Sequence, residues 1–261
     1  MKRAIIQYLI AALLAGCSGV GAADDLRLNV GGEYTSGKYG GTEKTEIRYF
    51  PVTGSYVTGL WLLKLTVPYL QISGPANIIG VDCSAMQIPM AQSAQNSARR
   101  TVSGLGDVIA AASYAVHENR AAGFFFDLTG KIKFGTADKD RNLGTGKNDY
   151  SIQGGISKRT NNWTLFSDLG WRKMGNPSGI TFENPRYGSV GASYGVSNSA
   201  TAGMAYDYRA RIVDGGANVR ELTAFVVLGL GKAAKIQGYI SKGFSDASPD
   251  RGAGLTWSSG F

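Results

Sequence analysis

The sequence contains few residues that could carry out covalent or metal chemistry. Its 261 residues include one histidine, His117, and two cysteines, Cys17 and Cys83. A nucleophilic serine needs a base to orient it, and a structural zinc ion needs several Cys or His ligands. The periodicity places His117 in a turn between two strands, away from any wall where such a base could act. We therefore expect no catalytic residue, no zinc site and no cofactor.

One polar loop carries oxygen ligands at a spacing that could hold a cation. Asp138, Asp140 and Asn142 take positions one, three and five of a loop in which Asp149 is the twelfth residue, as in a calcium-binding loop. Leu143 stands where the sharp turn of such a loop requires glycine, and the twelfth residue is Asp instead of Glu. A solvated loop is the favoured interpretation, and calcium binding by these residues is the alternative.

Charged residues also recur at every second position along apolar stretches. Between residues 121 and 134, Asp127 and Lys131 alternate with Phe126, Leu128 and Ile132. A period of two is typical of a β-strand, because successive side chains point to opposite faces. The charged residues that we expect on inner, polar faces, as candidates for the lining of a lumen, are Arg48, Lys64, Asp127, Lys131, Lys133, Asp168, Arg172, Asp207, Arg209 and Arg211.

These inner charges allow two interpretations. Opposite charges on neighbouring strands can pair and stabilise a narrow interior. They can also form a lining that selects among solutes, and a basic chain then favours anions. Basic residues are scattered along the chain and form no focused patch, so we expect no nucleic-acid partner.

The last stretch, 251–261, shows the alternation most clearly. Leu255, Trp257 and Phe261 share one face, while small or weakly polar residues such as Thr256 and Gly260 share the other. An apolar, aromatic outer face and a small, polar inner face are typical of a wall between lipid and an aqueous lumen. A terminal strand ending in Phe261 also resembles the signal by which the barrel-assembly machinery recognises outer-membrane proteins. We therefore expect membrane lipid and that machinery as partners.

The composition agrees with a membrane barrel. Hydrophobic residues make up 43% of the chain and charged residues only 18%, below the roughly 25% of an ordinary soluble domain. Beyond the N-terminus, no apolar run approaches the ~18 residues that a membrane helix needs. A chain of this kind can span a membrane only as a closed barrel, in which every backbone group is paired between strands. A soluble β-sandwich is the alternative.

The spacing of turns favours the barrel. Twelve strands are expected between residues 24 and 261, and Pro51 should cause a bulge or bend in the second. The expected connections at 58–59, 117–120, 160–162, 197–199 and 231–234 are short. Those at 37–42, 74–101, 135–147, 174–184, 213–217 and 246–250 are generally longer. Short periplasmic turns alternating with longer outer loops are typical of bacterial outer-membrane barrels. The predicted fold is an all-β, antiparallel, up-and-down transmembrane barrel of about twelve strands.

The N-terminal residues have the pattern of a secretion signal. Lys2 and Arg3 precede an apolar stretch, Ile5 to Ala15, that is too short to span a bilayer, and Ala23 ends an acceptable cleavage site. Residues 1–23 are expected to be removed, which leaves a barrel of residues 24–261 and lowers the formal charge from +8 to +6. Leu14-Ala15-Gly16-Cys17 also matches a lipoprotein cleavage site, so acylation of Cys17 is the alternative.

Several short sequence motifs resemble those of a known family. They are Tyr49-Phe50-Pro51-Val52-Thr53-Gly54, Ser103-Gly104-Leu105-Gly106-Asp107, Lys133-Phe134-Gly135-Thr136, Leu143-Gly144-Thr145-Gly146 and Ser248-Pro249-Asp250. In this order they are similar to the outer-membrane proteins grouped as the phenol-degradation MetA-pathway family, over essentially the whole mature chain. The resemblance implies a transporter-like barrel in the outer membrane and passage of small, aromatic compounds.

Two functions remain open from the sequence. The first is a channel or transporter for passive uptake or efflux of a small aromatic or anionic solute, with the segment 74–101 folding inward as a constriction or staying outside. The second is a non-conducting barrel whose outer loops bind a partner. Both functions need the same wall.

Overall fold

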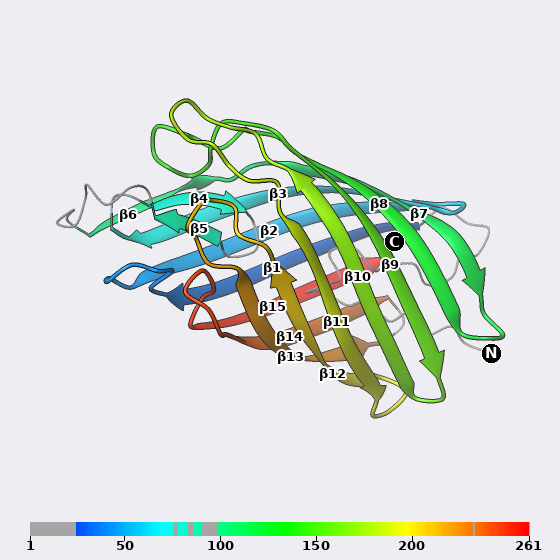
Figure 1. Ribbon diagram of the computed structural model, residues 1–261. Coiled ribbons are helices and arrows are strands. Elements are labelled where there is room, and N and C mark those ends of the chain that lie inside the picture. The colour runs from blue at the N-terminus through cyan, green and yellow to red at the C-terminus, as the bar shows by residue number, and fades with distance from the viewer. Residues whose placement is uncertain (1–24, 76–77, 83–85, 90–98, 232, 261) are drawn as a thin grey trace.

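The computed structural model describes residues 25–75, 78–82, 86–89, 99–231 and 233–260 (Figure 1). The predicted signal segment 1–23 and the C-terminal Phe261 lie outside these ranges. The described residues contain no helix long and apolar enough to cross a membrane.

The described chain folds almost entirely into antiparallel β-strands. They are β1 (Asp25–Gly37), β2 (Thr45–Thr58), β3 (Trp61–Gly74), β4 (Ile78–Asp82), β5 (Met86–Pro89), β6 (Arg100–Leu105), β7 (Ile109–Asn119), β8 (Phe124–Lys133), β9 (Asp149–Thr160), β10 (Trp163–Lys173), β11 (Arg186–Gly195), β12 (Ala200–Arg209), β13 (Val219–Leu230), β14 (Ala234–Gly243) and β15 (Arg251–Gly260).

The main sheet closes on itself. β1 pairs with β2, β2 with β3, β3 with both β6 and β7, and the strands from β7 to β15 pair in sequence order. The pairing of β15 with β1 closes the sheet. The sheet has thirteen strands. β6 and β7 pair with β3 one after the other, so together they fill a single strand position of the barrel wall, here called a stave. The closed wall therefore has twelve staves, and the prediction of a twelve-stranded up-and-down barrel is confirmed. Figure 1 shows the staves strongly inclined, with the longer loops at one end, here called the outer end.

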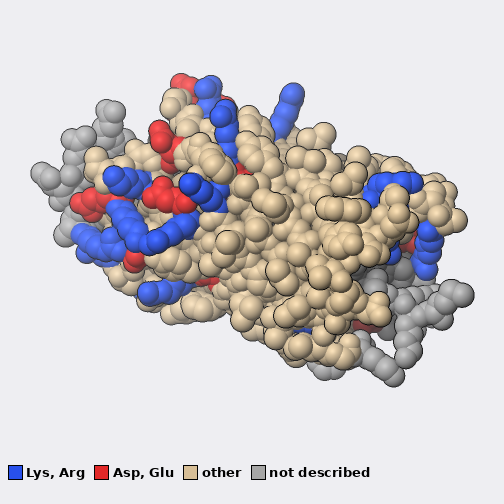
Figure 2. Space-filling view, turned by 90° about the horizontal axis from the view of Figure 1, so that it is seen from below, with Lys and Arg blue, Asp and Glu red and all other residues tan. Residues whose placement is uncertain are grey.

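The two faces of each stave differ as the alternation predicts. In β10, Trp163, Leu165 and Leu169 are exposed on the outside, whereas Phe166 and Arg172 are buried on the inside. Figure 2 shows that the middle of the outer wall is almost free of charged residues, which gather toward the two ends. An apolar band between two polar ends is the surface that a bilayer requires.

The fourth stave is interrupted opposite Pro68. Tyr69 faces Leu105 and Thr66 faces Ile109, so the two residues between them on β3 oppose three residues, 106–108. Gly106 N donates to the Pro68 carbonyl at 2.9 Å, which shows that Pro68 turns its N-substituted side to this stave, where it has no N–H to donate. The missing donor explains the bulge between β6 and β7, in place of the unbroken strand expected there.

Two other local predictions were wrong. Pro51 causes no bulge, since the register of β2 runs past it without a shift both toward β3, where Pro51 faces Pro68, and toward β1. Gly31 of β1 leaves room for the proline ring, because a Cβ there would lie 3.2 Å from the proline Cγ. His117 lies within β7, beside an irregularity in its pairing with β8, and its ring centroid is 5.9 Å from that of Phe124. The turn therefore follows Asn119 instead of starting at His117.

The long connection between β3 and β6 contains a short hairpin. In it, β4 pairs with β5 antiparallel, with Ile79 facing Ile88. Sequence periodicity did not indicate these strands. The hairpin lies at the outer end of the barrel (Figure 1).

Candidate functional site: the lumen and its outer mouth

The register places most of the predicted lining residues on the inner face. Eight of the ten share the face of buried polar neighbours such as Thr129, Gln153 and Ser189. These eight are Lys64, Asp127, Lys131, Lys133, Asp168, Arg172, Asp207 and Arg209.

Arg48 was placed on the wrong face. It shares the outer face of β2 with the exposed Phe50 and Val52, and its Nη1 donates to Gln71 Oε1 at 2.6 Å. The inner face at this level is taken by Ile47 and Tyr49, which are buried. Apolar residues face inward here because they join an apolar cluster in the barrel mouth, which inverts the polarity that strand periodicity alone indicates.

Arg211 also lies outside the lumen. β12 ends at Arg209, and Arg211 belongs to the following outer loop. Its Nε lies 3.1 Å from Glu183 Oε1, and its Nη2 lies 3.6 Å from Asp214 Oδ1. The guanidinium therefore joins two outer loops and does not line the passage.

Four inner carboxylates occupy one inclined row. Across the ladder, Glu221 faces Asp207, Asp207 faces Ser189, Ser189 faces Asp168, Asp168 faces Gly155, and Gly155 faces Asp127. We call Asp127, Asp168, Asp207 and Glu221 the acidic row. The Ser189 hydroxyl donates to Asp168, whereas Asp207 Oδ2 has no hydrogen-bond partner among the described residues.

Four inner cations occupy a second row. Arg172 faces Ser151, Ser151 faces Lys131, Lys131 faces Ala111, Ala111 faces Lys64, Lys64 faces Ser55, and Ser55 faces Arg27. We call Arg27, Lys64, Lys131 and Arg172 the basic row. The Arg172 guanidinium lies 5.6 Å from the ring centroid of Tyr187, and Arg27 Nη2 lies 2.6 Å from Asp25 Oδ2.

The two rows run parallel along the lumen. On β8 and on β10 the base follows the acid by four residues, Asp127 to Lys131 and Asp168 to Arg172, which is about 13 Å along a strand. Because barrel strands are tilted, a row that crosses them climbs along the barrel axis. The climb brings Lys64 close enough to act electrostatically on Asp127, and Lys131 on Asp168. Successive levels of the lumen therefore carry both signs of charge on different parts of the wall.

Inner aromatic rings lie along the wall. Phe166 covers Gly191, Phe225 covers Gly203, and each ring leaves no room for a Cβ on its glycine. Both phenylalanines are buried, in one cluster with Ala205. Both rings therefore occupy the inner face of the wall. No sequence pattern indicated these pairings, because the glycines come from neighbouring strands.

A buried ion-pair cluster lies at the outer mouth. Lys133 Nζ lies 2.7 Å from Asp107 Oδ2 and 3.4 Å from Asp149 Oδ2, and all three side chains are at most 6% exposed. Asp107 Oδ1 also accepts the Ala137 N–H at 2.9 Å, and Asp149 Oδ1 accepts the Gly175 N–H at 2.9 Å. Asp107 lies in the bulge after β6. The bulge therefore positions a carboxylate that holds the loop 134–148. We call Asp107, Lys133 and Asp149 the mouth ion cluster.

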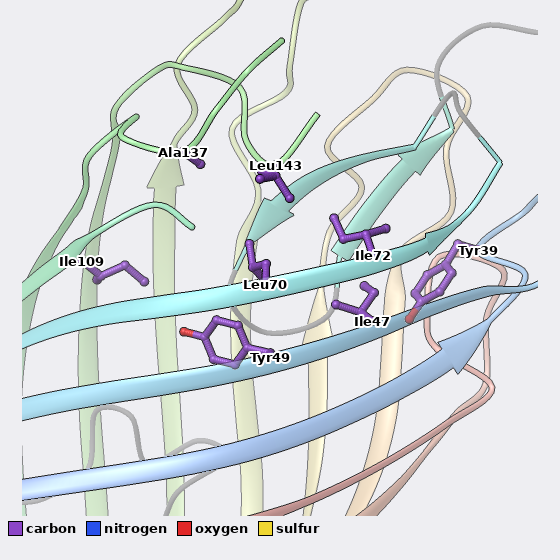
Figure 3. Close-up of a cluster of buried hydrophobic side chains, with 8 residues drawn as sticks. All are labelled: Tyr39, Ile47, Tyr49, Leu70, Ile72, Ile109, Ala137 and Leu143. Atoms are coloured by element: carbon purple, nitrogen blue, oxygen red, sulfur yellow. The ribbon is translucent and has the colours of Figure 1, made fainter. Parts of the chain in front are cut away.

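The loop 134–148 also inserts apolar side chains into the mouth. Figure 3 shows Leu143 directed at Leu70 and Ile72, with Ala137 from the same loop beside it. We call this group the mouth cluster; its members are Tyr39, Ile47, Tyr49, Leu70, Ile72, Ile109, Ala137 and Leu143. Burial raises the pKa of the Tyr39 phenol above its ordinary value of 10.0, against the opposing effect of its hydrogen bond to Thr35.

The proposed calcium ligands do not converge. Asp149 is held by Lys133 and Gly175, whereas Asp138 Oδ1 accepts the backbone N–H groups of Asp140 and Arg141 at 3.0 and 3.2 Å. The described residues contain no group of three or more His, Cys, Asp or Glu side chains that could hold a metal ion. The structure therefore does not bring Asp138, Asp140, Asn142 and Asp149 together as one group of ligands. The loop positions an apolar anchor instead.

The closed, two-faced wall defines a membrane-spanning β-barrel, and solved structures share this fold. The β-domain of the Bordetella autotransporter BrkA has 13% identity and a TM-score of 0.53, over 92% of this chain and 100% of that one. The transport unit of the autotransporter AIDA-I from Escherichia coli has 11% identity and a TM-score of 0.52, over 92% and 90% of the two chains. The P. putida toluene transporter TodX has 11% identity and a TM-score of 0.45, over 93% and 91%, a likeness too small to bear on function.

The chain belongs to the family described as "Putative MetA-pathway of phenol degradation", whose model matches residues 25–259. This confirms the resemblance found in the sequence. No curated protein matches the chain.

Proposed function

We propose that this protein is a passive channel of the bacterial outer membrane for a small solute. The observation that carries the proposal is the pair of charged rows along the interior of a wall whose outside is apolar. A barrel interior built only for stability would favour well-packed apolar side chains, because buried ion pairs are often no more stable than apolar replacements. A charged interior is better explained by the passage of water and polar solutes.

The charge pattern favours solutes without net charge. A lumen lined by one sign attracts the opposite ion, whereas this lumen presents both signs close together at successive levels. An anion attracted by Lys131 also meets Asp168, and a cation attracted by Asp127 also meets Lys64. The anionic solute expected from the net charge is therefore replaced by a net-neutral one. The family description supports small aromatic compounds such as phenols as the first class to test.

A second candidate function has a specific observation in its favour. The mouth cluster is as well buried as a soluble protein core, with Leu143 1% exposed. This packing supports a barrel that does not conduct and whose outer loops bind a partner.

Single-channel recording of the refolded protein in planar bilayers separates the two functions. The channel proposal predicts small, steady steps for the wild type. It predicts clearly larger steps when residues 138–145 are replaced by two glycines, since this removes Leu143 from the mouth. A folded shortened variant that still does not conduct would contradict the channel and leave the surface-binding barrel.

A further inference from the structure

Three exposed cations stand together on the membrane-facing side of β13, β14 and β15. Arg220, Lys242 and Arg251 lie at the outer ends of these strands, on the same faces as the exposed Val226, Ile240 and Leu255. Phe244 N donates to the Arg220 carbonyl at 2.9 Å, and Ser241 faces Gly252. Lys242 faces Leu222 on β13, so it lies diagonal to Arg220, and it lies beside Arg251 on β15. We call the three residues the rim cations.

The rim cations have no anionic partner in the part of the chain that the structure describes. None of them forms an ion pair with another described residue. Asp250 precedes Arg251 in the sequence but lies in no such pair. Lys242 Nζ lies 5.9 Å from the ring centroid of Phe244, which holds the ammonium beside an aromatic ring. Like charges side by side on a sheet destabilise it, so an anion supplied from outside would relieve their repulsion.

Among the described residues, the same faces carry no such cations at the opposite end. There the outward positions of β13 and β15 are held by residues such as Leu228, Leu230 and Trp257. Lys173 and Arg186, on β10 and β11, repeat the pattern as exposed, outward cations at the outer end. Figure 2 shows charged side chains gathered at the ends of the apolar band. The rim cations therefore stand at the boundary where lipid headgroups meet the wall.

We propose that the rim cations bind the phosphate groups of phosphorylated lipids in the outer leaflet. Arginine and lysine form charge-assisted hydrogen bonds with phosphate, and basic groups at a membrane surface attract anionic headgroups. Headgroup phosphates lie at the height of the rim cations, whereas the acyl chains of the same lipids cover the apolar band below them. This binding depends on the membrane fold and not on channel activity.

The test measures lipid binding by the purified, folded full-length protein. Native mass spectrometry compares lipid A, lipid A stripped of its phosphates, and inorganic phosphate as a competitor. The test variant carries Arg220→Gln, Lys242→Gln and Arg251→Gln. The control carries Lys139→Gln, Arg141→Gln and Lys147→Gln, which removes the same charge from an exposed outer loop away from the wall.

We expect the test variant to bind lipid A about 100-fold more weakly than the wild type at low salt, from roughly a fivefold loss for each cation. The control should keep wild-type affinity, and the dephosphorylated lipid should bind no better to the wild type than to the test variant. Equal binding of lipid A by the wild type and the test variant would overturn the proposal. Displacement by equimolar inorganic phosphate would also overturn it, because the site would then recognise a free anion. Lys242→Gln alone should weaken binding about fivefold, which keeps the test valid if the triple variant misfolds.

Discussion

The outer mouth and the middle of the lumen are built on different principles although the same staves form both. In the mouth, Leu143 and its apolar neighbours exclude water, and Lys133 is enclosed by two carboxylates and a loop. In the middle, charged side chains of both signs line the wall in two parallel rows. The mouth resembles the core of a soluble protein, whereas the middle resembles the lining of a passage.

The difference separates stability from function within one barrel. Groups in the mouth cooperate to hold the loop 134–148 in place, so their loss should affect mainly folding and closure. Groups in the middle are spread along the wall, so their loss should affect mainly which solutes pass. A substitution should therefore act according to the region in which the residue lies.

The largest effect is expected at Lys133. Lys133→Ala leaves Asp107 and Asp149 buried without their cation, and breaking a buried pair in this way costs about 3–5 kcal/mol. Urea unfolding of the barrel in lipid vesicles measures the free energy of unfolding. Lys131→Ala, two residues along the same inner face, serves as the control and should cost less than half as much. Equal losses would mean that the mouth has no special role in stability.

A somewhat smaller loss is expected at Leu143. Leu143→Ala removes a side chain that is 1% exposed and should cost about 2–4 kcal/mol by leaving a cavity. It should also enlarge the conductance steps in bilayer recordings, because the loop is held less firmly in the mouth. Leu165→Ala, on the lipid-facing wall and 57% exposed, is the matched control. A Leu143→Ala protein with wild-type stability and wild-type conductance would show that the apolar contacts do not hold the loop.

The smallest effects are expected for the charged rows in the middle of the lumen. Substitutions in the two rows should shift the reversal potential in opposite directions. Asp127→Asn with Asp168→Asn should shift the reversal potential toward anion selectivity. Lys64→Gln with Lys131→Gln should shift it toward cations. We expect the permeability ratio of anions to cations to change about twofold for each charge removed, because the charged groups are partly hydrated. Arg48→Gln, on the outer face, should leave the ratio unchanged. Shifts of the same sign in both double variants would contradict the two-row arrangement.

The sequence predicted the wall better than the interior. Alternation in β10 or β15 is enough to assign both faces, because the lipid environment imposes one apolar side on each strand. This rule fails at Ile47, Tyr49 and Arg48, where residues distant in sequence place an apolar cluster inside the mouth. It also fails at Asp149, which has the spacing of a metal ligand but is held by Lys133.

The sequence predicted that most of the individual charged residues face inward, but not that they align in two rows. Asp127, Asp168 and Asp207 are separated by long stretches of chain, and only the register of five strands brings them into line. The register depends on the turns and on local irregularities such as the bulge opposite Pro68. Neither follows a simple period in the sequence. The turn at His117 was misplaced for the same reason, since the irregularity in the pairing of β7 with β8 is not visible in the sequence.

The central claim is that this wall encloses a passage for net-neutral small solutes. It is tested most directly by swelling of proteoliposomes in glucose, gluconate and N-methylglucamine, which are similar in size but carry different charges. We predict that glucose enters fastest and that the anion and the cation are both slower. Entry of none of the three, with the shortened-loop variant also impermeable, would contradict the channel. Equal entry of all three would leave a channel but remove the selectivity assigned to the two rows.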